Sequence, residues 1–95
     1  MWVRERTLAV GILPNALPVT RLGLRVKRGI AGAVARNRAK RIFREAYRRD
    51  KERLAPGWDI VAVLTKASGL SVESLEREWI LACTKLKILA ATQSS

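Results

Sequence analysis

The chain has 95 residues, 48% of them hydrophobic, so it can bury one small core and has no need to be disordered. Its 19 Lys and Arg residues against eight Asp and Glu give a net charge of +11, which predicts a polyanionic partner, either nucleic acid or an anionic membrane. With no histidine and a single cysteine, Cys83, the chain lacks the residues for an internal disulfide or for a usual zinc site.

The single cysteine also indicates a reducing environment, so we expect a cytoplasmic protein. No apolar run reaches the roughly 18 residues of a membrane span. The acidic Glu5 and the nearby Pro14 are untypical of a signal peptide. We therefore expect neither a membrane partner nor, since no catalytic constellation is present, a small-molecule substrate.

Two strands are expected in the first third of the chain. Residues 6–13 are mostly apolar and end at Pro14-Asn15, which is typical of a buried strand followed by a loop. Residues 21–27 alternate apolar side chains with glycine or cations, which predicts a strand with one apolar and one cationic face. The short connection between them predicts an antiparallel pair.

A helix is expected next, from about Ala33 to Leu54, because Arg, Ala, Lys and Glu dominate there without Gly or Pro. Gly32 is a possible N-cap, and residues 55–57, Ala-Pro-Gly, end the helix. Residues 58–65 are apolar on both faces, which suits a central strand.

The last expected element is a second helix capped by Ser71, which follows a loop at residues 67–69. Its apolar residues recur every three or four positions and form a buried stripe: Val72, Leu75, Trp79, Ala82, Leu86 and Leu89. The order β-β-α-β-α predicts a two-layer α+β sandwich. We expect one domain over residues 1–95, with a core at about 6–90.

The charge is concentrated in the middle of the chain, where residues 21–53 hold 13 Lys or Arg and three Asp or Glu. A helical projection gathers most of these cations on one side of the first helix. We call that side the cationic flank, and it comprises Asn37, Lys40, Arg41, Arg44, Arg48 and Lys51. The opposite side is apolar and comprises Ala35, Ala39, Ile42, Phe43 and Ala46.

The helix's own acids are not expected to neutralise this flank. Glu45 and Asp50 project away from its centre, and only Glu52 reaches its edge. Crowded like charges destabilise an isolated helix, so a polyanion explains them better than a solvated surface does, and guanidinium groups match phosphates well. A membrane-surface helix would need bulkier apolar residues than these alanines.

The segment Arg36-Asn37-Arg38-Ala39-Lys40-Arg41, followed by Arg44-Glu45, resembles the RNR motif of the bacterial ribonuclease P protein family. The flanking pieces are similar too. Arg21-Leu22-Gly23-Leu24 with Val26 resembles the preceding strand, and Gly57-Trp58-Asp59-Ile60-Val61 resembles the following one. The resemblance covers about residues 6 to 90.

This resemblance implies a left-handed β-α-β crossover in the sandwich. It also implies that the partner is a catalytic RNA, which cleaves the 5′ leader from precursor tRNA with magnesium. The protein is then a cofactor of an endoribonuclease, with no catalytic residue and no bound metal of its own. The implied contacts to the catalytic RNA are Arg36, Asn37, Arg38, Lys40, Arg41, Arg44 and Arg48. Those to leader or RNA phosphates are Arg25, Lys27 and Arg28.

Two features depart from the family pattern. The family usually begins with a basic, aromatic helix that lines the leader cleft, whereas here only residues 1–5 precede the first expected strand. The family's two lysines and glycine after the cationic strand are replaced by residues 27–32, Lys-Arg-Gly-Ile-Ala-Gly. We therefore expect a truncated or divergent member of the family.

Other readings stay open on sequence alone. The chain has the charge of a structural RNA-binding protein, such as a ribosomal protein, or of a non-specific DNA-binding module. Trp58, Trp79 and Cys83 are expected in the core, and Asp59 is expected to accept hydrogen bonds at a turn. Trp2 could stack on a base or lie in a mobile N-terminus. Tyr47 could stack on a base or pack at the boundary of the core.

Overall fold

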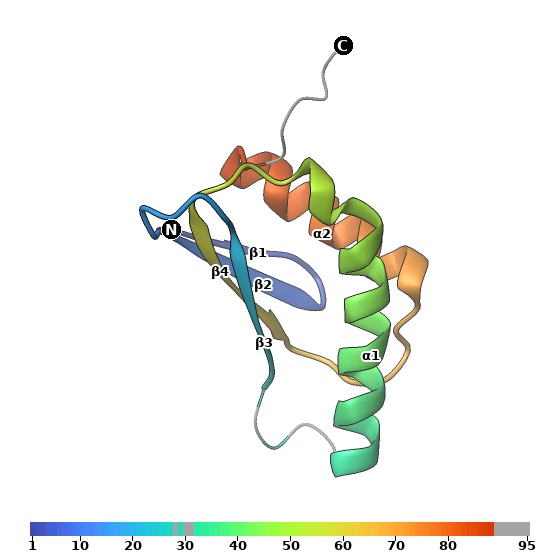
Figure 1. Ribbon diagram of the computed structural model, residues 1–95. Coiled ribbons are helices and arrows are strands. Elements are labelled where there is room, and N and C mark those ends of the chain that lie inside the picture. The colour runs from blue at the N-terminus through green and yellow to red at the C-terminus, as the bar shows by residue number, and fades with distance from the viewer. Residues whose placement is uncertain (28, 30–31, 89–95) are drawn as a thin grey trace.

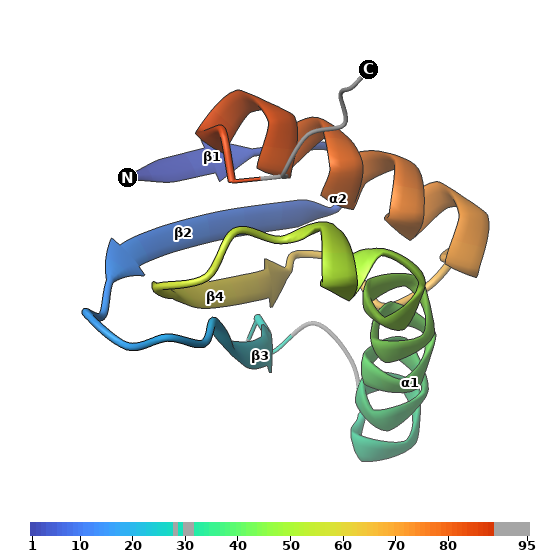
Figure 2. The same ribbon diagram turned by 45° about the horizontal axis from the view of Figure 1, so that its top comes forward.

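A four-stranded sheet with both helices packed on one of its faces forms the structure, a computed structural model that describes residues 1–27, 29 and 32–88 (Figure 1). The elements are β1 (Trp2–Arg4), β2 (Leu8–Pro14), β3 (Arg21–Val26), α1 (Ala33–Asp50), a 3-10 turn (Lys51–Arg53), β4 (Trp58–Leu64) and α2 (Val72–Leu86). Helix α2 packs against β1 and β2, and α1 packs against β3 and α2 (Figure 2). The two-layer α+β sandwich expected from the sequence is confirmed.

The strand order across the sheet is β1-β2-β4-β3. Strand β2 pairs antiparallel with both β1 and β4, and β3 pairs parallel with β4. The expected antiparallel pair of β2 and β3 is therefore wrong, because β4 lies between them. Strand β4 is apolar on both faces and takes the central position, which leaves β3, with its cationic face, at the edge.

The observed order of strands and α-helices is β-β-β-α-β-α. It has one strand more than the expected β-β-α-β-α, because Trp2–Arg4 forms β1. Three residues are too few for a recognisable alternation, so this strand depends on its pairing with β2. Strands β3 and β4 are parallel and joined through α1, as the resemblance implies. The left hand of that crossover stays a prediction.

Alternate residues of the strands point at the helices and form the core. In β2 and β4 these positions include Leu8, Val10, Ile60 and Leu64, each no more than 1% exposed. The other face of the sheet, which we call the open face, carries Trp2, Arg4, Ala9, Gly11, Leu13, Arg21, Gly23, Arg25, Asp59, Val61 and Val63. Among the described residues, no helix packs on this face, and Trp2, Arg4 and Arg25 on it are exposed.

The two helices interlock through three aromatic rings. Trp79 of α2 lies edge-on to Phe43 and Tyr47 of α1, with ring centroids 5.4 and 5.6 Å apart. Phe43 and Trp79 are fully buried, and Cys83 lies beside them in the core. Burial raises the pKa of the Cys83 thiol to about 12, so it stays protonated and acts as a small apolar group.

The ends of the helices follow local chemistry. Helix α1 ends at Asp50, four residues earlier than expected, and the chain tightens into the 3-10 turn. At α2, Ser71 caps the helix as predicted: its hydroxyl accepts from the Ser74 amide, and the Ser74 hydroxyl accepts from the Ser71 amide. The predicted stripe is buried or half-buried from Val72 to Leu86, and its last member, Leu89, lies outside the described residues.

A carboxylate clamp joins the starts of β3 and β4. Asp59 accepts hydrogen bonds from Arg21 Nε and Nη2, both at 2.8 Å, and from Asn15 Nδ2 at 2.9 Å. These bonds hold the pKa of Asp59 at about 2, below its usual 3.8. Asp59 is therefore a hydrogen-bond acceptor as expected, but it lies within β4 and bridges to β3, so the expected turn position is wrong.

We expect Phe43→Ala to lower the free energy of unfolding by about 3–5 kcal/mol, because it removes a fully buried ring from the contact between the helices. Urea denaturation measures this. The matched control is Arg44→Ala at the next, exposed position, which should change stability by no more than about 0.5 kcal/mol. Similar losses in both variants would contradict the observed rotation of α1.

The Asp59 clamp should stabilise the fold at neutral pH and lose this effect in acid. Because the folded-state pKa lies below the unfolded one, the stabilisation is present above about pH 4 and disappears as the pH falls towards 2. Urea midpoints of the native chain and of Asp59→Asn should therefore differ at pH 7 and converge in that window. A difference that stays constant down to pH 2 would argue against the clamp.

Candidate nucleic-acid interface

The rotation of α1 is set by its buried side. Ala39, Phe43 and Ala46 are fully buried, whereas Asn37, Arg41, Arg44, Arg48 and Lys51 of the cationic flank are exposed and Lys40 is half-exposed. The helical projection is thus confirmed, although Ala35 and Ile42 of the apolar side are only half-buried. The helix presents its cations to solvent along one side because its apolar side is held against the core.

Some of the cations on α1 are paired with acids. Arg48 Nη2 lies 2.6 Å from Glu45 Oε1. The expectation that Glu45 neutralises no cation of the flank is therefore wrong for Arg48. The two residues are three apart on the helix, close enough for flexible side chains to meet. Arg49 reaches across to α2, where Nη1 lies 3.1 Å from Glu76 Oε1.

Most cations of the flank have no acidic partner within the part of the chain that the structure describes. Among the described residues, no carboxylate oxygen lies within 4.0 Å of the charged nitrogens of Lys40, Arg41 or Arg44. Like charges at this spacing repel one another, at a cost that the tertiary packing of the helix must offset. Their donors are free to meet the oxygens of a polyanion.

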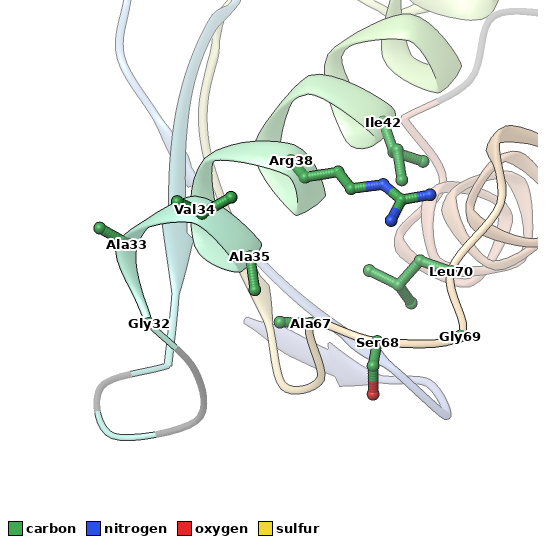
Figure 3. A pocket seen from close by; sticks show the side chains of 10 residues that line it. All are labelled: Gly32, Ala33, Val34, Ala35, Arg38, Ile42, Ala67, Ser68, Gly69 and Leu70. Carbon is green, nitrogen blue, oxygen red and sulfur yellow. The ribbon is translucent and has the colours of Figure 1, made fainter.

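Arg38 stands apart from the cationic flank. Its side chain extends towards Ile42 and Leu70, on the side of α1 that faces the β4–α2 connection (Figure 3). It borders a pocket of about 650 Å³ whose other lining residues are small or apolar, including Val34, Ala35 and Ala67. The predicted contact residues of the RNR segment therefore do not form one continuous surface.

The start of α1 meets the end of β3. Arg36 lines a groove of about 470 Å³ together with Arg25, Val26 and Lys27 of the cationic strand and Val63 of β4. The fold thus brings the RNR segment and the predicted phosphate-contacting residues to one place. Arg28, the third of those residues, lies outside the described residues.

The open face holds a cation that the sequence did not single out. The strand register aligns Arg4 of β1 with Ala9, Val63 and Arg25 across the four strands. Arg4 and Lys27 also line one pocket of about 540 Å³ on this face. The sequence carried no signal for Arg4, because its place depends on the pairing of a three-residue strand.

The aromatic residues divide between core and surface. Tyr47 is half-buried against Phe43 and Trp79, which favours boundary packing over base stacking, and burial raises the pKa of its hydroxyl. Trp79 is fully buried in the core, as predicted, whereas Trp58 packs against the core but is only half-buried. Trp2 is paired into β1 and remains 61% exposed.

The described residues contain neither a cluster of potential metal ligands nor a membrane-spanning helix. Among them, no three Cys, Asp or Glu side chains gather as a metal site would require. No helix among those residues has the length and apolar character needed to cross a bilayer. The charged groups that the candidate interface exposes are the guanidinium and ammonium groups of its Arg and Lys side chains.

Comparison with known sequences gives one consistent family. The family model described as Ribonuclease P matches residues 2–87. The ribonuclease P protein component of Dehalococcoides mccartyi strain CBDB1 is 42% identical over 81 residues, which are 84% of this chain and 66% of that protein. That of Natranaerobius thermophilus is 33% identical over 79 residues, 82% of this chain and 69% of that protein. The chain thus spans about two thirds of the length of these relatives.

Solved structures agree on the fold. The Staphylococcus aureus RNase P protein superposes with a TM-score of 0.80 over 94% of this chain and 83% of its own, at 23% identity. The RNase P protein from Thermotoga maritima gives a TM-score of 0.75 over 85% of this chain and 78% of its own, at 27% identity. With the family model covering nearly the whole described fold, the chain belongs to the Ribonuclease P protein family.

Proposed function

We propose that this chain is the protein subunit of ribonuclease P. It binds the catalytic RNA through α1 and the 5′ leader of precursor tRNA through the groove beside β3. It thereby promotes the endonucleolytic cut that produces the mature 5′ end of the tRNA. The observation that carries the proposal is that Lys40, Arg41 and Arg44 of the cationic flank have no carboxylate partner among the described residues, on a helix whose other side is packed in the core. Membership of the family supports it.

The cationic flank suits a structured RNA. Arginine forks bind phosphate oxygens with two parallel hydrogen bonds, and each phosphate neutralised releases counterions into solution. Such binding needs the cations to be presented in a fixed pattern. The aromatic contact of Phe43 and Tyr47 with Trp79 supplies that rigidity. Arg48 can also join by exchanging Glu45 for a phosphate, since that exposed pair is weak.

The groove beside β3 suits the leader. Arg25 and Lys27 are exposed at the end of the edge strand, and Arg36 of α1 lines the same groove. A single strand that enters here lies next to whatever RNA the RNR segment holds. The protein would thus bring the substrate strand and the catalytic RNA to one site, which raises the affinity of the complex for precursor tRNA.

The chemistry of cleavage belongs to the RNA in this proposal. The chain's own residues bind and orient, and none is assigned a proton transfer or a nucleophilic role. Magnesium, bound with the RNA, supplies the activated water and the charge stabilisation for phosphodiester hydrolysis. The cations of the protein lower the repulsion between the two RNAs, so less magnesium is needed. The complex is expected in the cytoplasm.

Arg44→Ala should weaken binding to the catalytic RNA and flatten its salt dependence. For each lost phosphate contact, the slope of log K against log salt should fall by about 0.7–0.9. Filter binding across a salt series measures both quantities. Arg49→Ala is the matched control, because Arg49 lies on the same helix but is engaged with Glu76 of α2. Equal losses in the two variants would mean that net charge acts, and not the cationic flank.

Holoenzyme reconstitution tests the function itself. The purified chain should stimulate leader cleavage by a bacterial ribonuclease P RNA at low magnesium, and Arg41→Ala with Arg44→Ala should reduce the stimulation while thermal unfolding stays the same. A folded chain that gives no stimulation would refute the proposal. Association with ribosomal subunits in its place would favour a structural ribosomal role, and equal affinity for duplex DNA would indicate a non-specific module.

A further inference from the structure

Two exposed cations lie beside the connection between β4 and α2. Arg6 belongs to the turn between β1 and β2, and Lys66 begins the connection. The two segments are tied together, because the Thr65 amide donates to the Thr7 carbonyl oxygen at 2.9 Å. Among the described residues, no carboxylate oxygen lies within 4.0 Å of the charged nitrogens of Arg6 or Lys66. The fold brings these two cations together without pairing either of them with an acid of the described chain.

Arg6 and Lys66 line one pocket of about 380 Å³, together with Ser68 and Gly69. Both loop residues are exposed, and Gly69 has a φ of 71°, a left-handed conformation that favours glycine. A Cβ atom built on Gly69 would meet nothing within 4 Å, so the main chain of the loop is bare here. We call this set the loop surface: Arg6, Lys66, Ser68 and Gly69. It combines positive charge, a hydroxyl group and an accessible backbone.

The acid that lines the same pocket, Glu78 of α2, is already engaged. Its Oε1 accepts from the Thr7 amide at 2.8 Å, and both of its oxygens accept from the Thr7 hydroxyl at 2.9 Å. These bonds hold the turn between β1 and β2 on α2. Two cations against one engaged carboxylate leave the pocket with a net positive charge.

The loop surface adjoins the cationic flank of α1. Arg38 and Arg41 are three residues apart, so their side chains are neighbours on the helix. The pocket beside Arg38 shares residues 68–70 with the pocket of the loop surface. The Ser68 hydroxyl points away from Arg38 (Figure 3). An RNA backbone that lies on Arg41 can therefore run past Arg38 to the loop surface.

We propose that the loop surface binds a backbone phosphate of the catalytic RNA, with Arg6 and Lys66 on the phosphate oxygens and the Ser68 hydroxyl donating to them. Cations, hydroxyl groups and backbone amides make most contacts to nucleic-acid phosphates. An anionic membrane would call for bulky apolar side chains beside the cations, and Leu70 is the only one among the described residues that line this pocket.

The position of the loop surface favours the catalytic RNA over the precursor tRNA. The inference rests on the proposed function, in which the flank of α1 binds the catalytic RNA and the leader enters the groove beside β3. Arg36 lines that groove and is two residues from Arg38, so the two side chains point to different sides of α1. The loop surface lies on the side of Arg38, away from the groove.

Binding to the purified catalytic RNA across a salt series tests the loop surface. Lys66→Gln and Arg6→Gln should each weaken binding and lower the slope of log K against log salt by about 0.7–0.9, the effect of one lost phosphate contact. Lys87→Gln is the matched control for Lys66→Gln, because Lys87 is an exposed lysine past the far end of α2. Urea midpoints should be the same in all these chains. An equal fall of the slope in the Lys66 and Lys87 variants would overturn the proposal.

Directed hydroxyl-radical cleavage identifies the bound strand. Cys83, the single cysteine of the chain, is buried, so Ser68→Cys supplies one reactive thiol for an iron chelate. In the reconstituted holoenzyme with precursor tRNA bound, the cuts should fall in one short stretch of the catalytic RNA. A chelate at Thr84→Cys, exposed near the far end of α2, should not cut that stretch. Cuts confined to the precursor tRNA, or no cuts in either RNA, would overturn the proposal.

Failure of the loop surface differs from failure of the proposed function. If the native chain stimulates leader cleavage while Lys66→Gln and Arg6→Gln keep its salt slope, the loop surface alone is refuted. If the folded native chain neither binds the catalytic RNA nor stimulates cleavage, the proposed function is refuted, and this inference with it.

Discussion

The edge-to-face contact of Trp79 with Phe43 and Tyr47 determines how α1 sits on the sheet. Two rings of α1 meet one ring of α2, and Ala39 and Ala46 on the same side are small enough to let the helices approach closely. This contact sets the rotation of α1 about its axis. Every cation on the helix then has a defined direction, which local propensity alone cannot provide, because crowded like charges destabilise an isolated helix.

The same packing determines which cations are paired with acids and which are not. Arg49 and Arg53 pair with acids of α2 and of α1 itself and help to hold the fold together. Lys40, Arg41 and Arg44 have no such partner among the described residues, and in the proposed function they contact the RNA. A net charge of +11 is therefore a poor measure of the interface. What matters is which guanidinium groups the fold leaves without a carboxylate.

The open face adds a second surface on the other side of the sheet from the helices. Its positive border combines Arg4, from one edge strand, with Arg25 and Lys27, from the other. Arg36 joins the second group from α1, so the groove beside β3 links the helix surface to the sheet surface. In the proposed function, RNA contacts both surfaces.

The sequence by itself determined the helices, three of the four strands, the buried side of α1 and the predominance of cations on its other side, because these follow from local periodicity and composition. Only the tertiary structure decided that β4 separates β2 from β3, since pairing depends on which strand can be buried on both faces. It also decided that Glu45 meets Arg48, that Arg38 turns towards Leu70, and that Trp2 lies on Gly11. Side-chain reach and strand register bring together residues that no local pattern connects.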